Sequence, residues 1–192
     1  MKEKAININN IGSLYFSKKE RSMEKQIQYP YLPEGKQFLY VEARNVFMTA
    51  AKMYAEEFSL DKVMPGTAVV VKDRKILGIG ANGSDYHKTH SCRRVELGCK
   101  SGEGYDLCEG CHPKNHSETT AINDAVKKGY NPRGADLYLW GHFWCCKPCW
   151  DAMIKAGIRN VYLMEGSERL FNKEHPDNIV GKQFEKTARR RL

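Results

Sequence analysis

Apolar residues recur along the chain with two different periods, and this pattern predicts where helices and strands lie. Between residues 41 and 58 the spacing is three and four residues, as on the buried face of an amphipathic helix, with apolar side chains at Phe47, Ala50, Ala51, Tyr54 and Phe58. Further helices are predicted over residues 116–128 and 147–156. Strands are predicted over residues 67–71, 75–80, 136–140 and 159–164, the first two as a hairpin. Helices and strands alternate in the second half, which indicates an α/β domain with parallel crossovers.

The same pattern indicates one domain with two flanking segments. Residues 1–36 are polar and charged and end in a stretch with Pro30, Pro33 and Gly35, which is typical of a linker or an entry turn. We therefore predict an N-terminal extension over 1–36, a domain over 37–167 and a basic tail over 168–192. Within the domain, residues 86–113 are irregular and rich in cysteine, as expected of an insertion.

Composition excludes several classes of protein. With 41% apolar residues the chain can bury a core, unlike a disordered tail. Its apolar runs are too short to span a bilayer, and no apolar stretch of about 7–15 residues follows the N-terminal lysines as in a secretory signal. We therefore expect a cytoplasmic protein with no membrane contact.

The net charge of +8 suggests a polyanionic partner such as nucleic acid. However, each flanking segment carries +3, so only +2 remains for residues 37–167. The tail ends in Arg189, Arg190 and Arg191, which are placed to contact phosphates or, more simply, to remain solvated at a chain end.

The seven cysteines, in a chain without an export signal, favour metal binding or catalysis over a set of disulfides. Cys146 and Cys149 lie three residues apart at a predicted helix start, so both sulfurs point the same way, and the helix dipole favours their thiolate form. His116, at the start of another predicted helix, adds a nitrogen donor. Three protein ligands with a fourth position left for water is the layout of a catalytic zinc site. Glu118 is not needed as a ligand, which makes it a candidate to move a proton between water and substrate.

His-x-Glu followed by a Cys-x-x-Cys helix resembles the zinc-dependent cytidine deaminase superfamily. The resemblance runs from about Val41 to Met164, and within it the chain is most similar to the deoxycytidylate (dCMP) deaminases. Residues 80–84, Gly-Ala-Asn-Gly-Ser, resemble the Gly-x-Asn-Gly turn of those enzymes. The resemblance to their insertion is carried by Cys92, Arg93, the Ser-Gly-Glu run at 101–103, Tyr105 and Cys108.

This resemblance implies a three-layer α/β/α domain with a mixed central sheet of about five strands. It implies that Glu118 is the general acid and base, that Asn82 bonds the sugar and that the Ser117 amide meets the base carbonyl. It also implies that the catalytic zinc is held by His116, Cys146 and Cys149. The implied reaction replaces the C4 amine of a cytosine nucleotide by hydrolysis and releases ammonia, in a protein that forms a homo-oligomer.

The chain departs from the usual family pattern at three places. Cys145 stands where a proline usually precedes the first zinc cysteine, and Ser117 stands where alanine or valine is usual. The lead-in over residues 140–144 is longer and more aromatic. None of these differences removes a ligand, so they bear on the substrate rather than on the zinc chemistry.

Four further cysteines predict a second, structural zinc site: Cys92, Cys99, Cys108 and Cys111. The resemblance agrees, because some dCMP deaminases carry a structural zinc in this region. The alternatives are free thiols, or a histidine in place of one cysteine, with His87, His90 and His112 nearby. Cys145 is then left over, as a packing residue or an alternative ligand.

Two residues are candidates for further substrate contacts. Arg93, with Lys88 and Arg94 nearby, is placed to meet a 5′-phosphate, although a solvated loop charge explains it equally well. Trp144, with the other aromatic residues around the zinc cysteines, is a candidate wall for the base, and core packing is the alternative.

Three functions are therefore considered. The first is a nucleotide deaminase that converts dCMP to dUMP. The second is a deaminase of single-stranded DNA or RNA, suggested by the charge, the arginine tail and the aromatic residues. The third is a non-catalytic zinc-binding module, against which Glu118 argues because a binding module has no need of it.

Overall fold

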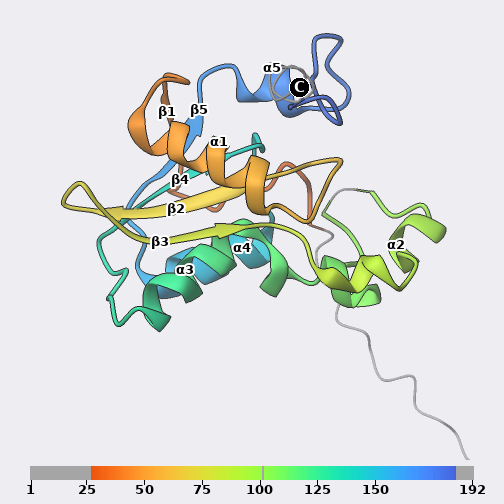
Figure 1. The fold of residues 1–192 in the computed structure, drawn as a ribbon, viewed down its shortest axis with the longest axis horizontal. Coiled ribbons are helices and arrows are strands. Elements are labelled where there is room, and N and C mark those ends of the chain that lie inside the picture. Colours follow the sequence, from red (N-terminus) through yellow and green to blue (C-terminus); the bar gives the residue numbers. More distant parts are fainter. Residues whose placement is uncertain (1–26, 101, 185–192) are drawn as a thin grey trace, which may run out of the picture.

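A computed structural model describes residues 27–100 and 102–184 of the chain, and a five-stranded sheet lies at its centre (Figure 1). The strand order is β1-β5-β4-β2-β3. The strands are β1 (Phe38–Val41), β2 (Thr67–Lys72), β3 (Lys75–Ala81), β4 (Asp136–Trp140) and β5 (Val161–Met164). β1, β5 and β4 pair in parallel, whereas β2 pairs antiparallel with both β4 and β3. The predicted mixed sheet of an α/β fold is thus confirmed.

Helices cover both faces of this sheet and complete three layers (Figure 1). α1 (Val46–Phe58) covers one face, and α3 (Ser117–Lys127) and α4 (Lys147–Ala156) cover the other. Two short helices complete the described elements: α2 (Arg93–Glu96), which lies in the insertion beside the sheet (Figure 1), and α5 (Ser167–Phe171). On β2, Ala68 and Val70 pack in the core beneath α3 and α4, while Val69 and Val71 pack in the core beneath α1. Successive side chains of a strand point to opposite faces, so a strand covered on both faces is apolar throughout. Among the described residues, no helix is long and apolar enough to span a membrane.

The helix predicted over residues 41–58 begins later than its apolar pattern suggests. Asn45 caps it, because its Oδ1 accepts hydrogen bonds from the backbone N–H of Phe47 at 3.0 Å and of Met48 at 3.3 Å. The residues before this cap form the edge strand β1 beside β5. A strand of four residues is too short to show a clear period, and its pairing partner lies far away in the sequence.

Parts of both predicted flanking segments pack on the domain. Phe171, in α5, is 1% exposed and meets the indole ring of Trp140 edge-on, with ring centroids 5.2 Å apart. Phe184 stacks on the same indole at 5.3 Å. Tyr29 and Tyr31 pack against the core on the α3 and α4 side. Residues 27–36 and 168–184 therefore contribute to the folded unit, whereas the arginines at 189–191 and residues 1–26 lie outside the described residues.

Glycines in β3 allow α3 to lie close against the sheet. A Cβ added to Gly80 would lie 2.3 Å from the backbone nitrogen of Ala121 in α3, so the helix or the strand would have to move. We expect Gly80→Ala to lower the free energy of unfolding by about 1–3 kcal/mol, measured by urea denaturation. The matched variant is Ile76→Ala on the same strand. Ile76 is 39% exposed, so this substitution should lower the free energy of unfolding by less. Equal losses for the two variants would contradict this account of the packing.

Candidate functional site

The N-termini of α3 and α4 bring three metal-binding side chains together. His116 is the N-cap residue of α3, Cys146 is the N-cap residue of α4, and Cys149 lies in the first turn of α4. The Nδ1 atom of His116 is 3.3 Å from the Sγ atom of Cys149 and 3.4 Å from that of Cys146. All three donor atoms lie within 4.8 Å of one another, so three residues predicted as ligands from the sequence form one group.

This group fits a zinc ion in both chemistry and spacing. One imidazole nitrogen and two thiolate sulfurs are ligands that zinc prefers, and in a tetrahedral site such atoms lie about 3.6 Å apart. Hydrogen bonding from the Cys149 thiol lowers the pKa of Cys146 to about 6, although burial acts in the opposite direction. The thiolate, which is the form that binds metal, is thus favoured at Cys146 near neutral pH.

The orientation of the His116 ring is fixed by a backbone carbonyl. The Nε2 atom lies 3.2 Å from the carbonyl oxygen of Cys111, so Nε2–H donates and Nδ1 is left to face the two cysteines. Burial alone would lower the pKa of His116, but the hydrogen bond and the charge of Cys146 outweigh it and raise that pKa.

Glu118 lies in the first turn of α3 and is only 5% exposed. Its Oε2 atom accepts a hydrogen bond of 3.1 Å from the hydroxyl of Ser117, which is itself fully buried. Burial, together with the charge of Glu118, raises the pKa of Cys145 well above its usual value, so that thiol stays protonated near the carboxylate. A buried carboxylate therefore lies next to the metal-binding group without belonging to it.

Asn82 is held within the protein by its own amide. Its Oδ1 atom accepts hydrogen bonds from the Ser59 hydroxyl at 2.7 Å and from the backbone N–H of Gly66 at 2.8 Å. Its Nδ2 atom donates to the carbonyl of Met64 at 2.8 Å. These bonds tie the glycine-rich turn to the loop after α1. The predicted contact between Asn82 and the sugar stays a prediction. Because Oδ1 already accepts two hydrogen bonds and Nδ2 already donates one, the Asn82 side chain could make this contact only through its second Nδ2 hydrogen.

Two neighbouring arginines of the insertion have different surroundings. Arg93 is exposed and its guanidinium lies 3.0 Å from the carboxylate of Glu96. The guanidinium of Arg94 lies 4.4 Å above the ring of Tyr105, whose ring meets His116 edge-on at 4.8 Å. Arg94 is therefore connected to the metal-binding group through Tyr105, and the phosphate contact of Arg93 stays a prediction.

Aromatic residues from distant parts of the chain lie near the zinc cysteines. Trp144 is half-buried, and its ring centroid lies 5.1 Å from that of Tyr29. Burial and then the charge of Cys146 raise the pKa of Tyr29, and the same two causes raise that of Tyr105. Sequence reasoning did not select these tyrosines for the site. Tyr105 could have been found because it lies within the family-like insertion, whereas nothing in the sequence connects Tyr29 to residue 146.

A second group of donor atoms lies in the insertion: His87, Cys92, Cys108 and Cys111, all within 4.8 Å of one another. The Nε2 atom of His87 is 3.1 Å from the Sγ atom of Cys108, and the Sγ atoms of Cys92 and Cys111 are 3.5 Å apart. Cys99, which was expected as the fourth ligand, lies outside this group and beside Gly104.

Gly110 explains why His87 takes that position. A Cβ at residue 110 would lie 2.5 Å from the Cε1 atom of His87, so only a glycine leaves room for the imidazole ring. One imidazole and three thiols are again a donor set that zinc prefers, and four protein donors make a closed, structural type of site.

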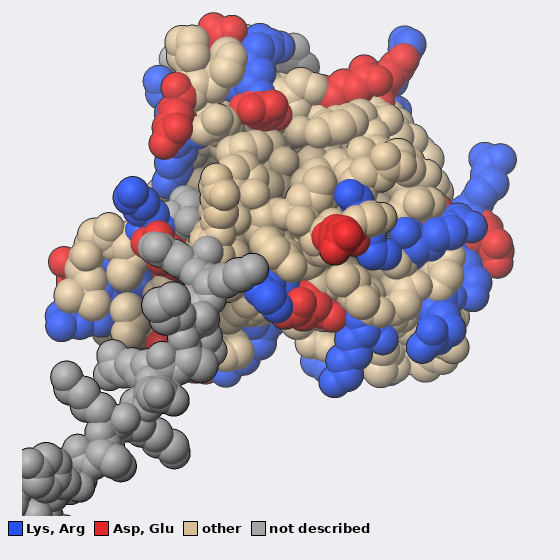
Figure 2. Space-filling model, turned by 180° about the vertical axis from the view of Figure 1, so that it is seen from behind, with Lys and Arg blue, Asp and Glu red and all other residues tan. Residues whose placement is uncertain are grey.

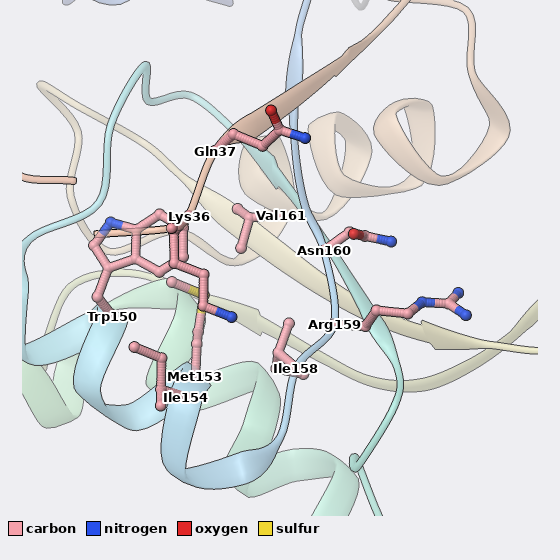
Figure 3. Close-up of a pocket in the computed structure, with 10 residues that line it drawn as sticks. Lys36, Gln37, Trp150, Met153, Ile154, Ile158, Arg159, Asn160 and Val161 are labelled. Atoms are coloured by element: carbon pink, nitrogen blue, oxygen red, sulfur yellow. The ribbon is translucent and has the colours of Figure 1, made fainter. Parts of the chain in front are cut away.

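A cavity of about 140 Å³ lies apart from both groups (Figure 3). Lys36, Gln37, Trp150 and Asn160 are among the residues that line it, and no residue of either donor group does. On the face shown in Figure 2, basic and acidic side chains are interspersed around a broad uncharged area, rather than gathered into one basic patch.

Comparison with known proteins identifies a family and several relatives. Residues 41–165 match the family described as the cytidine and deoxycytidylate deaminase zinc-binding region. ComE operon protein 2 of Bacillus subtilis (strain 168) is 29% identical over 119 residues, which are 62% of this chain and 57% of that protein.

Solved structures also resemble the chain. The dCMP deaminase of cyanophage S-TIM5, solved with dCMP and dUMP, is 25% identical with a TM-score of 0.43, over 62% of this chain and 79% of that one. The diaminohydroxyphosphoribosylaminopyrimidine deaminase/reductase of Thermotoga maritima is 26% identical with a TM-score of 0.38. The match covers 61% of this chain and 28% of that one. The chain thus spans 57% of the Bacillus protein and 28% of the Thermotoga protein.

The family match covers the whole sheet apart from most of β1, and it includes both groups of donor atoms. The chain belongs to the zinc-binding cytidine and deoxycytidylate deaminase family.

Proposed function

We propose that the protein catalyses the hydrolytic deamination of a cytosine nucleotide, converting dCMP to dUMP and ammonia. The observation that carries this proposal is the convergence of two helix N-termini, which groups His116, Cys146 and Cys149 beside the buried carboxylate of Glu118. The family match and the Gly-Ala-Asn-Gly-Ser turn at 80–84 support a cytosine nucleotide as the substrate.

In this proposal each residue near the metal-binding group has a defined task. When bound by the three donors, zinc lowers the pKa of a water ligand to about 7 and so supplies a nucleophile at neutral pH. Glu118 would take up one proton of the attacking water and deliver it to N3 of the pyrimidine. It would then take the second proton from the oxygen newly bonded to C4 and deliver it to the amine, which leaves as ammonia when the C4–N bond breaks. Ser117 holds the carboxylate through its hydroxyl, and its backbone N–H, at the open end of α3, donates to the base carbonyl.

The second donor group holds a structural zinc in this proposal, so the chain binds two ions. Within the described part of residues 86–113, only Gly102, Cys108 and Gly110 are buried. A segment with so little buried apolar surface needs another source of order, and a closed site with four protein donors supplies it.

The charge distribution favours a mononucleotide over a polynucleotide. Residues 37–167 carry a net charge of only +2, and Figure 2 shows no continuous basic track on the face in view. Binding to single-stranded nucleic acid depends on a positively charged groove that follows the backbone.

The test is a substrate panel assayed by ammonia release. It contains deoxycytidine, CMP, dCMP, dCTP, guanine and a deoxycytidine-containing oligonucleotide. We expect the highest kcat/KM for dCMP, with little dependence on salt. Conversion of the oligonucleotide but not of dCMP would overturn the proposal, and so would activity confined to guanine.

A further inference from the structure

We propose that the second donor group controls the first through one residue, Cys111, which acts as a positioning residue for His116. The thiol of Cys111 belongs to the insertion group, while its carbonyl oxygen accepts the hydrogen bond from Nε2 of His116. Occupancy of the second metal site would then set the zinc affinity of the first. This inference rests on the proposed function, because it requires both groups to bind zinc.

The segment that carries Cys111 is short and is held by few bonds. It forms one turn of 3₁₀-helix over Glu109–Cys111. The backbone N–H of Cys111 donates to the carbonyl of Cys108 at 3.0 Å. The side chain of Asn115 donates to the carbonyls of Glu109 at 2.8 Å and of Gly110 at 3.2 Å. All of these bonds are local, so none of them ties the turn to the sheet.

The thiol group of Cys111 supplies the missing long-range constraint. Its Sγ atom lies 3.5 Å from that of Cys92 and 3.9 Å from Nε2 of His87, two residues on separate turns earlier in the insertion. A metal held by these donors would fix the peptide of Cys111 relative to the rest of the insertion. Without the metal, the interaction of the Cys111 thiol with Arg94 would remain, and the carbonyl that orients His116 would be held less firmly.

The insertion makes a second contact with the imidazole ring of His116. Tyr105 packs its ring against His116 and lies beneath the guanidinium of Arg94. Arg94 in turn donates to the carbonyls of Glu103 at 2.7 Å and of Lys100 at 3.1 Å. The ring of His116 is therefore held by the insertion at its Nε2 atom and along one side.

Residues that orient a metal-binding histidine have measurable effects. Their loss typically lowers metal affinity about 10–100-fold, because the ring must then be ordered by the metal itself. The carbonyl of Cys111 cannot be removed by substitution, since it belongs to the backbone. It can be displaced by breaking the second group at Cys92, which contacts neither His116 nor the two zinc cysteines of α4.

The experiment compares Cys92→Ser with Cys99→Ser in the full chain. Both substitutions change a half-buried cysteine of the insertion, but only Cys92 belongs to the donor group. Zinc per chain is counted after dialysis, and the zinc affinity of the first site is measured by competition with a chromophoric chelator. We expect two zinc ions in the wild type and in Cys99→Ser. In Cys92→Ser we expect one zinc ion, bound about 10–100-fold more weakly at the first site.

Two further measurements separate orientation from general loss of structure. His87→Cys keeps four donors and should retain two zinc ions with the first-site affinity of the wild type. In Co²⁺-substituted Cys92→Ser, the absorption bands of the first site should change, whereas in Cys99→Ser they should not. If Cys92→Ser does not fold, His87→Ala takes its place, because that exposed side chain contributes to the same donor group.

The outcomes distinguish this inference from the proposed function. If the wild type binds only one zinc ion per chain, the second site and the coupling are both contradicted. The proposed deamination of dCMP is then still tested separately by the substrate panel. Two zinc ions in the wild type, with an unchanged first-site affinity and Co²⁺ spectrum in Cys92→Ser, would overturn the coupling alone.

Discussion

Replacing Glu118 by glutamine is expected to lower the turnover of dCMP about 10²–10⁴-fold, the usual contribution of a general acid and base. The amide keeps the size of the side chain and can still accept a hydrogen bond from Ser117, but it cannot take up and return a proton. Because Glu118 is not one of the grouped donors, the zinc content should stay at its wild-type value. Steady-state kinetics and metal analysis on the same preparation make the measurement.

A matched variant shows whether this loss is specific to the site. Glu165→Gln makes the same chemical change at an exposed position after β5, and turnover should remain near the wild-type value. A Glu118→Gln variant that keeps most of its turnover would show that the proton is moved by another group. Loss of zinc from the Glu118→Gln variant would instead indicate that Glu118 is a zinc ligand.

The elements that carry the zinc donors could be predicted closely from the sequence because their signals are local. The α4 helix has the predicted bounds, 147–156, since Pro148 suits a first helical turn and Gly157 ends the helix in a left-handed conformation with a φ of 77°. The strand β4 likewise has its predicted bounds, 136–140. His116 and Cys146 are the N-cap residues of α3 and α4. The sequence signals that mark the starts of these two helices therefore also predicted that His116, Cys146 and Cys149 form one group.

Features that depend on contacts between distant segments could not be predicted. β1 is short and is defined by its pairing with β5, and α5 is defined by the packing of Phe171 on Trp140. In the insertion, four cysteines within 20 residues indicated a zinc site. Their spacing alone could not show that the His87 ring packs against Gly110 and joins the donor group, while the Cys99 sulfur lies beside Gly104 and outside it. The hydrogen bonds that engage Asn82 come from a loop about 20 residues earlier, so the sequence showed its turn but not its partners.

Replacing Cys149 by alanine is expected to remove the zinc of the first site and to lower dCMP turnover at least about 10³-fold. The sulfur lies 3.3 Å from Nδ1 of His116 and is fully buried, so alanine leaves two donors and a small cavity. A metal worth several kcal/mol in the transition state corresponds to such a loss, since each 1.36 kcal/mol is a factor of ten in rate. Zinc per chain, measured by metal analysis, should fall from two to one.

Cys145→Ala is the matched comparison because it deletes an equally buried sulfur four residues away. Cys145 is 1% exposed and Cys149 is 0% exposed, so the loss of packing is similar for the two variants. Only Cys149 belongs to a donor group, and we therefore expect Cys145→Ala to keep both zinc ions. Loss of one zinc ion from Cys145→Ala with retention of both in Cys149→Ala would move the metal to the other cysteine and contradict the site described above. If both variants lose zinc, packing at the start of α4, rather than ligation by Cys149, holds the metal-binding group together.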